Sequence, residues 1–256
     1  MDGSDALVAR LRAAGCVFAE DEAEVLRSSA HDDAHLEAMS ARRVAGEPLE
    51  HVVGWAVLCG VRVHVGPGVF VPRQRSALLA RTAASLVAAS DVVVDLCCGS
   101  GALGLAVATL VPGVEVHACD VDPVAVACAS RNLAPVGGTA YAGDLNEALP
   151  ARLRGTVAVV VANVPYVPSR EIATLPREAR DHEPRATLDG GDDGLEVARR
   201  VVAQARDWLR GNGSVLVETT PDQATTVERW ALEHGGDPRT VTDDELDATV
   251  VVTTYR

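Results

Sequence analysis

The chain has 256 residues, of which 48 % are hydrophobic, and carries a formal net charge of −13. Its length suits one large domain, or a small domain joined to a standard one. No apolar run reaches the roughly 18 residues needed to cross a bilayer, and the N-terminus has no basic stretch followed by an apolar block. These features exclude a membrane span and a secretory signal, so we expect a cytoplasmic protein.

The charged and sulfur-containing residues narrow the chemistry. All 23 basic residues are Arg, which excludes a Schiff-base lysine and the Walker lysine of nucleotide phosphate sites. The acidic balance repels a phosphate backbone, so we expect no direct nucleic-acid binding and favour a basic protein partner. The six cysteines lack zinc-site spacings, and the pair His31 and His35 lacks a third ligand. We therefore expect reduced thiols and no metal.

The N-terminal part of the chain predicts a small lobe and a linker. Residues 1–45 carry apolar side chains at helical intervals among charged ones, which predicts a helical lobe. Residues 46–73 cluster β-branched residues around Gly60 and a Gly-Pro-Gly turn, which predicts a β-hairpin linker. A helix rich in Ala and Leu is expected from Pro72 to about Ser90. Residues 74–256 are then expected to form a second domain.

The second domain alternates short apolar segments with stretches of helical length, which is typical of a parallel doubly wound α/β sheet. The expected strands are Val92–Leu96, Val114–Asp120, a segment ending at Tyr141-Ala142-Gly143, Val157–Ala162, Ser214–Thr219 and Ala248–Thr254. The expected helices are Ala102–Leu110, Pro123–Ala134, Gly194–Arg210 and Pro221–His234. Open α/β sheets bind ligands at the carboxyl ends of their strands, so the residues that follow these strands are the candidates for a site.

A glycine-rich turn follows the first of these strands and leads into a helix. It consists of Cys97, Cys98, Gly99, Ser100 and Gly101. Glycines let a ligand approach the backbone closely, and the start of the helix offers free N–H groups. Cys97 stands where the dinucleotide-binding fingerprint needs glycine, which disfavours NAD, whereas Asp95 at the strand end suits a cationic group. A structural turn without a ligand is the alternative.

Acidic residues also follow the next two strands. Asp120 lies about 20 residues past the glycines, where a carboxylate can accept both hydroxyls of a ribose. Asp144 follows the third strand, within reach of an adenine edge, while Asp122 is expected to cap the next helix. Together with Asp95, these acids predict an adenosyl pocket at the crevice of the sheet.

The tetrapeptide Asn163-Val164-Pro165-Tyr166 follows the fourth strand, over the same crevice. Asn163 offers one amide acceptor and two donors, Pro165 stiffens the loop, and Tyr166 adds a flat face with a hydroxyl group. Such a set can hold a planar group that bears an NH₂. Taken alone, an ordinary turn at a strand end explains the same residues equally well.

Together these motifs resemble those of S-adenosylmethionine-dependent methyltransferases of the HemK/PrmC type, which methylate the side-chain amide of a glutamine in a protein. Four further segments are similar to that group: Gly46-Glu47-Pro48-Leu49, Pro67-Gly68-Val69 with Val71-Pro72-Arg73, Glu183-Pro184-Arg185-Ala186, and the loop from Leu188 to Leu195. The resemblance extends from about residue 46 to the end of the chain. The hairpin and the loop around Asp189 make it specific, because methyltransferases in general do not share them.

The resemblance implies a Rossmann-like class I methyltransferase sheet, a helical lobe over residues 1–45 that helps bind the protein substrate, and a hairpin linker over residues 46–73. It implies S-adenosylmethionine as the cofactor, held by Cys97, Cys98, Gly99, Ser100, Gly101, Asp120, Leu145 and Asn163. The acids at the strand ends add Asp95 and Asp144 to this set. The resemblance also implies that the target glutamine is bound by Asn163, Val164, Pro165 and Tyr166, with oxygens of the first residues accepting from the amide NH₂.

Three departures from the family pattern leave the substrate open. Val164 replaces a proline, which loosens the loop but keeps its carbonyl; the segment Pro72–Ala77 loses two acids and gains an Arg; and the segment Val217–Gln223 lacks the usual Glu-Ile-Gly. The target is a release factor, a ribosomal protein or another protein with an exposed glutamine. The alternatives are a small-molecule N- or O-methyltransferase, an adenine N-methyltransferase, which the acidic charge disfavours, and a non-catalytic S-adenosylmethionine-binding module.

Overall fold

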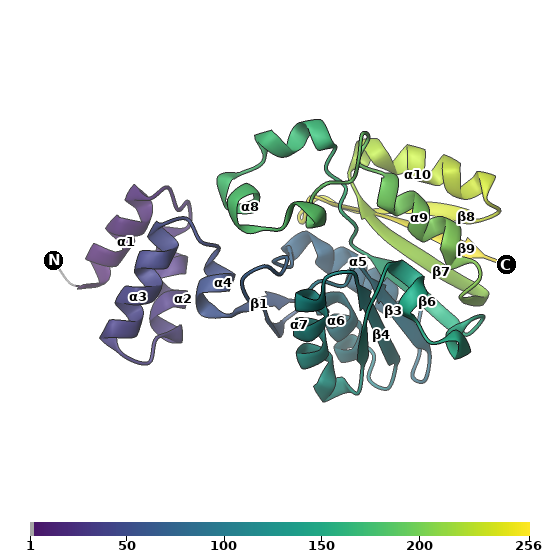
Figure 1. Ribbon diagram of the computed structural model, residues 1–256, viewed down its shortest axis with the longest axis horizontal. Coiled ribbons are helices and arrows are strands. Elements are labelled where there is room, and N and C mark those ends of the chain that lie inside the picture. Colours follow the sequence, from purple (N-terminus) through teal and green to yellow (C-terminus); the bar gives the residue numbers. More distant parts are fainter. Residues whose placement is uncertain (1–2) are drawn as a thin grey trace.

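A mostly parallel sheet with helices on both faces forms the centre of the structure (Figure 1). The structure is a computed structural model that describes residues 3–256, except the side chains of residues 3–5 and 177. Within these residues, seven strands form the main sheet in the order β5-β4-β3-β6-β7-β9-β8. They are β3 (Val92–Leu96), β4 (Glu115–Asp120), β5 (Thr139–Ala142), β6 (Val157–Ala162), β7 (Leu209–Thr219), β8 (Asp237–Asp243) and β9 (Ala248–Tyr255). The predicted α/β class and Rossmann-like sheet are confirmed.

The register of the strands creates a common edge for a site. The strands from β5 to β7 run parallel. Along the chain, β4 and β5 are added on one side of β3, and β6 and β7 on the other, so the crevice expected of such sheets lies between β3 and β6. Asp95 of β3 pairs with Ala118 of β4 and with Val161 of β6, so these strands end at the same edge. All six residues of β6 are buried, as expected for a strand covered on both faces.

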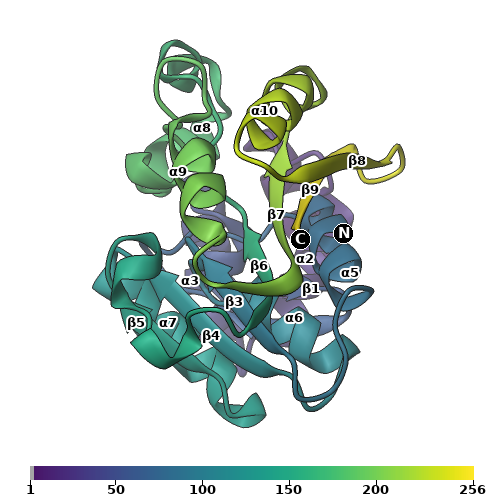
Figure 2. The ribbon, with the colours of Figure 1, turned by 90° about the vertical axis from the view of Figure 1, so that its right-hand side faces the viewer.

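Helices cover both faces of this sheet (Figure 2). On one face α5 (Ala77–Ala84), α6 (Ala102–Leu110) and α7 (Pro123–Leu133) pack their apolar side chains against the strands. On the other face α9 (Glu196–Ala205) and α10 (Pro221–Glu233) do the same. Two continuous apolar cores therefore hold the strand ends in place, and the ends carry the candidate site.

Local signals set where the helices begin. Asp122 accepts a hydrogen bond from the N–H of Val124 (2.8 Å) and caps α7, with Pro123 at the first helical position. The prediction for Asp122 is thus confirmed. At α10, Thr220 and Gln223 form a reciprocal capping box.

The N-terminal helices form a lobe at one end of the molecule (Figure 1). They are α1 (Gly3–Ala13), α2 (Ala19–Ser29), α3 (Asp33–Val44) and α4 (Leu49–Val53). Their apolar side chains make a cluster of their own, consisting of Leu7, Leu11, Cys16, Ala19, Ala23, Leu26, Met39 and Val52. The expected helical lobe is present, while its boundary at residue 45 and its role in substrate binding stay predictions.

A short hairpin connects the lobe to the sheet. Its strands β1 (Trp55–Leu58) and β2 (Val61–His64) are antiparallel and joined by Cys59 and Gly60, both with left-handed φ angles of 51° and 76°. Such two-residue turns match the twist of the strands. Asn132 of α7 accepts from the N–H of His64 (2.9 Å) and donates to its carbonyl (2.8 Å), which fastens the hairpin to the sheet body. A hairpin thus lies within the predicted segment 46–73, which also contains the unpredicted helix α4; that residues 46–73 form a linker stays a prediction.

The structure differs from the prediction chiefly in the last third of the chain. The sheet is not wholly parallel, because β9 runs antiparallel to both β7 and β8 and is joined to β8 by residues 244–247. β8 was not predicted, since this edge strand is mostly exposed or half-buried and carries no apolar alternation.

Two predicted helices are shorter than expected. α5 ends at Ala84, and the chain reaches β3 through a turn that includes Ser90 with a left-handed φ of 72°. α9 ends at Ala205, because Leu209 already pairs with Val157 and opens β7. In both segments the apolar residues that follow the helix pack in a loop or pair in a strand, and they do not add a further helical turn.

The remaining elements are short. A segment over residues 168–188 contains α8 (Arg177–His182) and arches over the ends of the strands. The 3₁₀ turns are Gln74–Ser76, Ala134–Val136, Leu145–Ala148, Ala151–Leu153, Ser169–Thr174 and Arg185–Thr187. Over residues 3–256, no helix has the length and apolar character required to cross a bilayer.

Candidate active site

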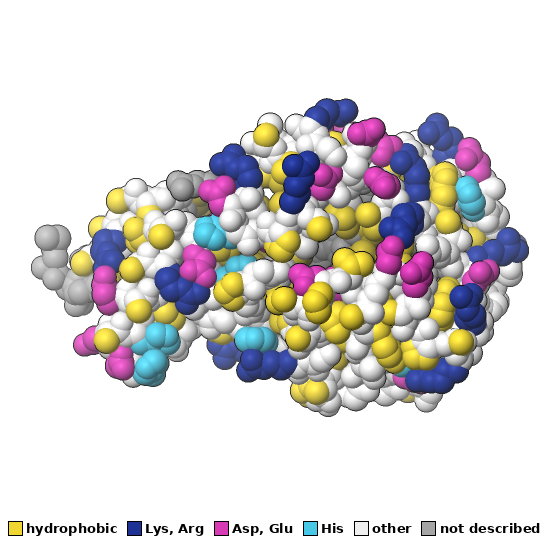
Figure 3. Space-filling model, viewed as in Figure 1, with side chains coloured by type: hydrophobic (Ala, Val, Ile, Leu, Met, Phe, Trp, Pro, Cys, Tyr) yellow, Lys and Arg dark blue, Asp and Glu magenta, His cyan; other side chains and the backbone are white. Residues whose placement is uncertain are grey.

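A cavity of about 330 Å³ lies at the carboxyl ends of the parallel strands. Most of the predicted site residues line it, namely Cys97, Gly99, Asp120, Asp144, Leu145, Asn163, Val164, Pro165 and Tyr166. Its other walls come from residues 70–75, before α5, and from the segment over residues 168–188. Figure 3 shows hydrophobic side chains gathered along the hollow between that segment and the sheet body. A volume of this size is typical of a small-molecule site.

Asp120 is fixed at the rim of the cavity by two backbone donors. Its Oδ2 accepts from the N–H of Gly99 (2.9 Å) and its Oδ1 from the N–H of Asp122 (3.0 Å). Burial raises the pKa of the Asp120 carboxyl, which the two backbone hydrogen bonds oppose. Gly101 needs its left-handed φ of 73°, and a Cβ there would lie 3.1 Å from the Cβ of Ala129. Glycine at 101 therefore lets the turn pack closely against α7.

Four of the predicted residues lie beside the cavity and not in its lining: Asp95, Cys98, Ser100 and Gly101. Asp95 is fully buried beneath the turn, where its Oδ2 accepts from the N–H of Gly104 (2.9 Å). Its Oδ1 is buried without a hydrogen-bond partner among the described residues, and burial raises the pKa of Asp95 to about 8. Asp95 thus braces the turn and the start of α6 from below.

Asp144 and Leu145 form the wall next to Asp120. Asp144 accepts from the guanidinium of Arg200 on α9 (2.6 Å), and both side chains line the cavity. Leu145 is buried and holds a left-handed φ of 50°. The Arg200 partner was not predicted, because 56 residues separate it from Asp144 and no local pattern marks it.

The tetrapeptide reaches the cavity from the end of β6. The Asn163 Nδ2 donates to the Ser76 Oγ (3.1 Å), and the Tyr166 hydroxyl donates to the Glu218 Oε1 (3.4 Å). The guanidinium of Arg75 lies 5.6 Å from the centre of the Tyr166 ring, with its Nε 3.5 Å from the same carboxylate oxygen. Burial raises the pKa of both Tyr166 and Glu218.

The loop before α9 supports this tetrapeptide from behind. The N–H of Val167 donates to the Leu188 carbonyl (3.0 Å), and the N–H of Gly190 donates back to the Val167 carbonyl (2.9 Å). The Tyr166 carbonyl accepts from the Gln223 side chain (2.9 Å). A Cβ at Gly190 would lie 2.6 Å from the Pro165 carbonyl oxygen, so the loop approaches the tetrapeptide as closely as glycine allows.

The segment over residues 168–188 covers the cavity and is tied down at two places. Glu183, which is buried, forms an ion pair with Arg73 (2.7 Å). Glu178 of α8 forms an ion pair with Arg43 of the helical lobe (3.2 Å). The segment therefore joins the lobe to the site across the sheet edge.

Four side chains of the site were missed by the sequence reasoning: Ser76, Glu183, Arg200 and Gln223. Each acts on a partner at least 56 residues away in the chain. The available signals were that Ser76 and Gln223 fall in the altered segments Pro72–Ala77 and Val217–Gln223, and that Glu183 opens a family-like motif. Arg75 is the arginine gained in Pro72–Ala77, and Glu218 belongs to the altered segment Val217–Gln223, but no sequence pattern marks them as partners.

Comparisons with known proteins give relatives over most of the chain. The sequence profile of the methyltransferase small domain family matches residues 60–177. A release factor glutamine methyltransferase of Streptomyces coelicolor is 40 % identical over 208 residues, which are 80 % of this chain and 74 % of that protein. One of Mycolicibacterium smegmatis is 41 % identical over 81 % of this chain and 73 % of its own length.

A solved structure agrees with the fold. The T. thermophilus 16S rRNA N2 G1207 methyltransferase, determined with AdoMet and guanosine, aligns with a TM-score of 0.57 at 23 % sequence identity. The alignment covers 79 % of this chain and 50 % of that one. At this identity the likeness bears on the fold alone.

Proposed function

Because the chain belongs to the family of release factor glutamine methyltransferases, we propose that it transfers a methyl group from S-adenosylmethionine to the side-chain amide nitrogen of a glutamine in a protein, with a release factor as the substrate. The family resemblance found in the motifs is confirmed. One observation supports the assignment of the site: the tetrapeptide Asn163–Tyr166 lines the same cavity as Asp120 and Asp144. The residues proposed to bind the cofactor and those proposed to bind the target glutamine thus line one cavity.

The residues around Asp120 suit an adenosyl cofactor. The two backbone N–H donors orient the Asp120 carboxylate, and its remaining lone pairs can accept the hydroxyls of a ribose. Gly99 of the turn lines the cavity without a side chain, and buried Leu145 offers an apolar wall. When bound, S-adenosylmethionine supplies an electrophilic methyl group on a sulfonium.

Asn163 and Val164 would orient the target amide. An amide nitrogen is a weak nucleophile, because its lone pair is delocalised into the carbonyl. The Asn163 Nδ2 is engaged by Ser76, which leaves Oδ1 to accept from the glutamine NH₂ together with the Val164 carbonyl. The Tyr166 ring limits the tilt of the amide plane. Orientation of this kind supplies roughly 7–11 kcal/mol in well-aligned pairs, and hydrogen bonds that strengthen as the nitrogen gains positive charge add to it.

The net charge and the free thiols of the chain indicate the kind of protein partner and the cellular compartment. A chain with a net charge of −13 attracts a basic surface on the protein substrate and repels nucleic acid. The six cysteines are free in the structure, in keeping with a reducing cytoplasm. We place the enzyme there on these grounds.

The test is methylation of a purified release factor with labelled S-adenosylmethionine. For Asn163→Ala we expect a loss of about 100-fold or more in kcat, comparable to the loss of one oriented transition-state partner. Calorimetry should show that this variant still binds the cofactor. Asn212→Gly is the control, because Asn212 is exposed and has a left-handed φ of 61° that glycine adopts freely. A wild-type rate in Asn163→Ala would contradict the assignment.

The alternatives are separated by the class of acceptor. A cell extract incubated with enzyme and labelled cofactor is sorted into protein, nucleic-acid and small-molecule fractions. Label on a glutamine in the protein fraction supports the proposal. Label only in another fraction supports a different acceptor, and binding of cofactor without transfer to any fraction supports a non-catalytic module.

A further inference from the structure

An arginine lies beside the residues proposed to bind the target glutamine. Arg75 belongs to the 3₁₀ turn Gln74–Ser76 and lines the cavity. Its guanidinium lies 5.6 Å from the centre of the Tyr166 ring. The next residue in the chain, Ser76, accepts a hydrogen bond from the Asn163 Nδ2 (3.1 Å). The turn therefore runs along the tetrapeptide Asn163–Tyr166, with Arg75 at its tyrosine end.

The other arginines of the cavity wall are engaged by carboxylates. Among the described residues, the lining contains Arg73, Arg75 and Arg200. Arg73 donates to both carboxylate oxygens of Glu183 (2.7 Å each), and Arg200 donates to Asp144 (2.6 Å). Such short, charge-assisted hydrogen bonds are strong, so these two arginines stabilise the walls of the cavity.

Arg75 has a looser partner. Its Nε lies 3.5 Å from the Glu218 Oε1, yet the guanidinium makes no hydrogen bond to a described residue. The Glu218 side chain is 2 % exposed and does not line the cavity, whereas the Arg75 side chain is 42 % exposed and does. A guanidinium carries several N–H donors and no acceptor. The cavity therefore meets a cation whose donors the described residues do not use.

Balancing the charge of Glu218 does not use up this arginine. In a tight pair such as Arg73 and Glu183, donor and acceptor lie at hydrogen-bond distance. At Glu218, the Arg75 Nε and the carboxylate Oε2 are both buried without a hydrogen-bond partner among the described residues. The attraction between the two charges thus holds the guanidinium at the wall and leaves its hydrogen-bonding capacity to a ligand.

The position of Arg75 along the sheet favours the acceptor protein as the source of that ligand group. The acids proposed for the cofactor, Asp120 and Asp144, end or follow β4 and β5. Tyr166 follows β6, and Glu218 lies on β7, on the other side of β3 in the sheet. Because Arg75 lies next to Tyr166 and Glu218, its guanidinium belongs to the acceptor half of the cavity.

From these contacts we infer that Arg75 is a specificity-determining residue, which binds the carboxylate of an aspartate or glutamate one or two residues from the target glutamine. The planar fork of a guanidinium matches a carboxylate in shape and charge. Consecutive Cα atoms are about 3.8 Å apart, so such a neighbour can reach Arg75 while the glutamine contacts the tetrapeptide. The inference rests on the proposed function and refines it. The chain as a whole attracts a basic surface, while this position selects an acid.

The kinetic test compares release factors that differ only beside the target glutamine. Each neighbour, up to two residues away on either side, is changed in turn to glutamate and to methionine, which has a similar length and no charge. With the wild-type enzyme, we expect glutamate at one of these positions to lower KM by about 5- to 20-fold relative to methionine, with little change in kcat. This range lies between an exposed ion pair and a buried charge-assisted hydrogen bond. The preference should shrink as the salt concentration rises.

Variants of the enzyme assign this preference to one side chain. Arg75→Met should have equal KM values for the glutamate and methionine substrates, and Arg75→Lys, which keeps the charge without the planar fork, should keep part of the preference. Arg152→Met is the control, because Arg152 is exposed and pairs with Glu115 at the far end of β4, and the change in net charge is the same. A wild-type enzyme without any preference, or a full preference in Arg75→Met, would overturn the inference.

Calorimetry tests whether the cofactor supplies the carboxylate instead. We expect Arg75→Met to bind S-adenosylmethionine with the wild-type affinity, which also shows that the variant is folded. A loss of affinity for S-adenosylmethionine in Arg75→Met that does not occur with decarboxylated S-adenosylmethionine would assign Arg75 to the cofactor. That result would contradict a contact with the acceptor protein.

A last measurement does not depend on turnover. In a ¹⁵N spectrum, the guanidinium resonances of Arg75 are identified by their absence in Arg75→Met. We expect a synthetic peptide with glutamate on both sides of a glutamine to shift them, and its counterpart with methionine to leave them unchanged. A shift in a protein that methylates no glutamine would contradict the proposed function alone. Methylation of the release factor with neither a shift nor a KM preference would contradict the role of Arg75 alone.

Discussion

Buried carboxylates distinguish the site from the rest of the acidic surface. Burial raises the pKa of Asp95, Asp120, Glu183 and Glu218, all of which lie in or beside the cavity. Exposed acids behave in the opposite way: a hydrogen bond from Arg10 lowers the pKa of Glu37, for example. Buried carboxylates whose pKa is raised by the loss of hydration are typical of functional sites.

The raised pKa of Asp95 predicts how the stability of the fold changes with pH. Its pKa of about 8 in the folded protein lies above the ordinary value of 3.8, so the folded state keeps the proton between these values while the unfolded state loses it. This contribution to stability is therefore present at low pH and lost as the pH rises through about 8. In Asp95→Asn, the amide oxygen can still accept from the N–H of Gly104. Because asparagine does not titrate, the variant should not show this loss of stability at higher pH.

The measurement is urea unfolding at about pH 5 and about pH 8, on either side of most of that change. The wild type should lose more stability between the two values than Asp95→Asn does. Asp237→Asn, at an exposed position, should keep the wild-type difference. An equal difference in wild type and Asp95→Asn would show that Asp95 is ionised throughout.

At the scale of elements, the loop between α8 and α9 acts as the rear support of the tetrapeptide. Its glycines permit an approach that no other residue tolerates, since a Cβ at Gly194 would collide with the Tyr166 carbonyl oxygen and lie 2.5 Å from the Gln223 Nε2. The family-like sequence around Asp189 therefore has a physical reason in the positions of Pro165 and Tyr166.

Gly194→Ala should move the tetrapeptide and lower activity. We expect about a 10- to 100-fold loss in kcat, because small displacements of orienting groups are costly, together with lower thermal stability. Gly155→Ala is a matched control, since Gly155 has a similar left-handed φ of 72° but open space around it. It should lose about 1–2 kcal/mol of stability from backbone strain and keep its activity. Equal activity in both variants would rule out the supporting role of the loop.

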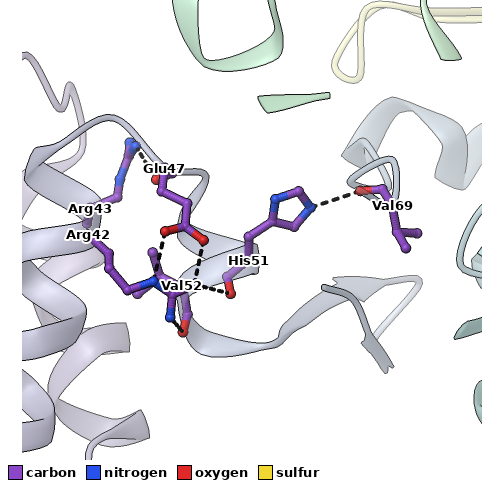
Figure 4. A network of polar contacts seen from close by, with 6 residues as sticks. All are labelled: Arg42, Arg43, Glu47, His51, Val52 and Val69. Atoms are coloured by element: carbon purple, nitrogen blue, oxygen red, sulfur yellow. Dashed lines mark hydrogen bonds and ion pairs between the residues drawn. The ribbon is translucent and has the colours of Figure 1, made fainter. Parts of the chain in front are cut away.

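At the scale of the whole molecule, arginines connect the helical lobe to the site. Arg42 holds the corner between α3 and α4 by bonding to Glu47 and to the carbonyls of His51 and Val52, and His51 donates to the Val69 carbonyl (2.8 Å) beyond the hairpin (Figure 4). Arg43 is buried and pairs with Glu22 of α2. Its second ion pair, to Glu178, ties the lobe to the segment that covers the cavity.

Glu178→Ala should loosen that covering segment without disturbing the lobe, because Arg43 keeps its pair with Glu22. A partly exposed ion pair contributes up to about 1 kcal/mol, so we expect trypsin to cleave after Arg170, Arg180 or Arg185 about two to five times faster. Glu171→Ala, whose ion pair with Arg170 is local, is the control. Unchanged cleavage in Glu178→Ala would show that the ion pair does not hold the segment down.

The sequence by itself determined the elements whose signals are local. The apolar runs of β3 and β6, the helix α6, the cap at Asp122 and the hairpin follow from side-chain periodicity and turn chemistry, which act within a few residues. The candidate acids and the tetrapeptide could be found in the same way, because parallel strands bring their ends to one edge.

Only the tertiary structure decided which of these residues meet in the cavity and what holds them there. Asp95 lies beneath the turn, while Ser76 and Glu218 join Asn163 and Tyr166 from 87 and 52 residues away in the chain. β8 and the antiparallel β9 likewise depend on pairing at the sheet edge. Such contacts arise from packing between segments that are far apart in the chain. This packing produces no periodic pattern in the sequence of either segment.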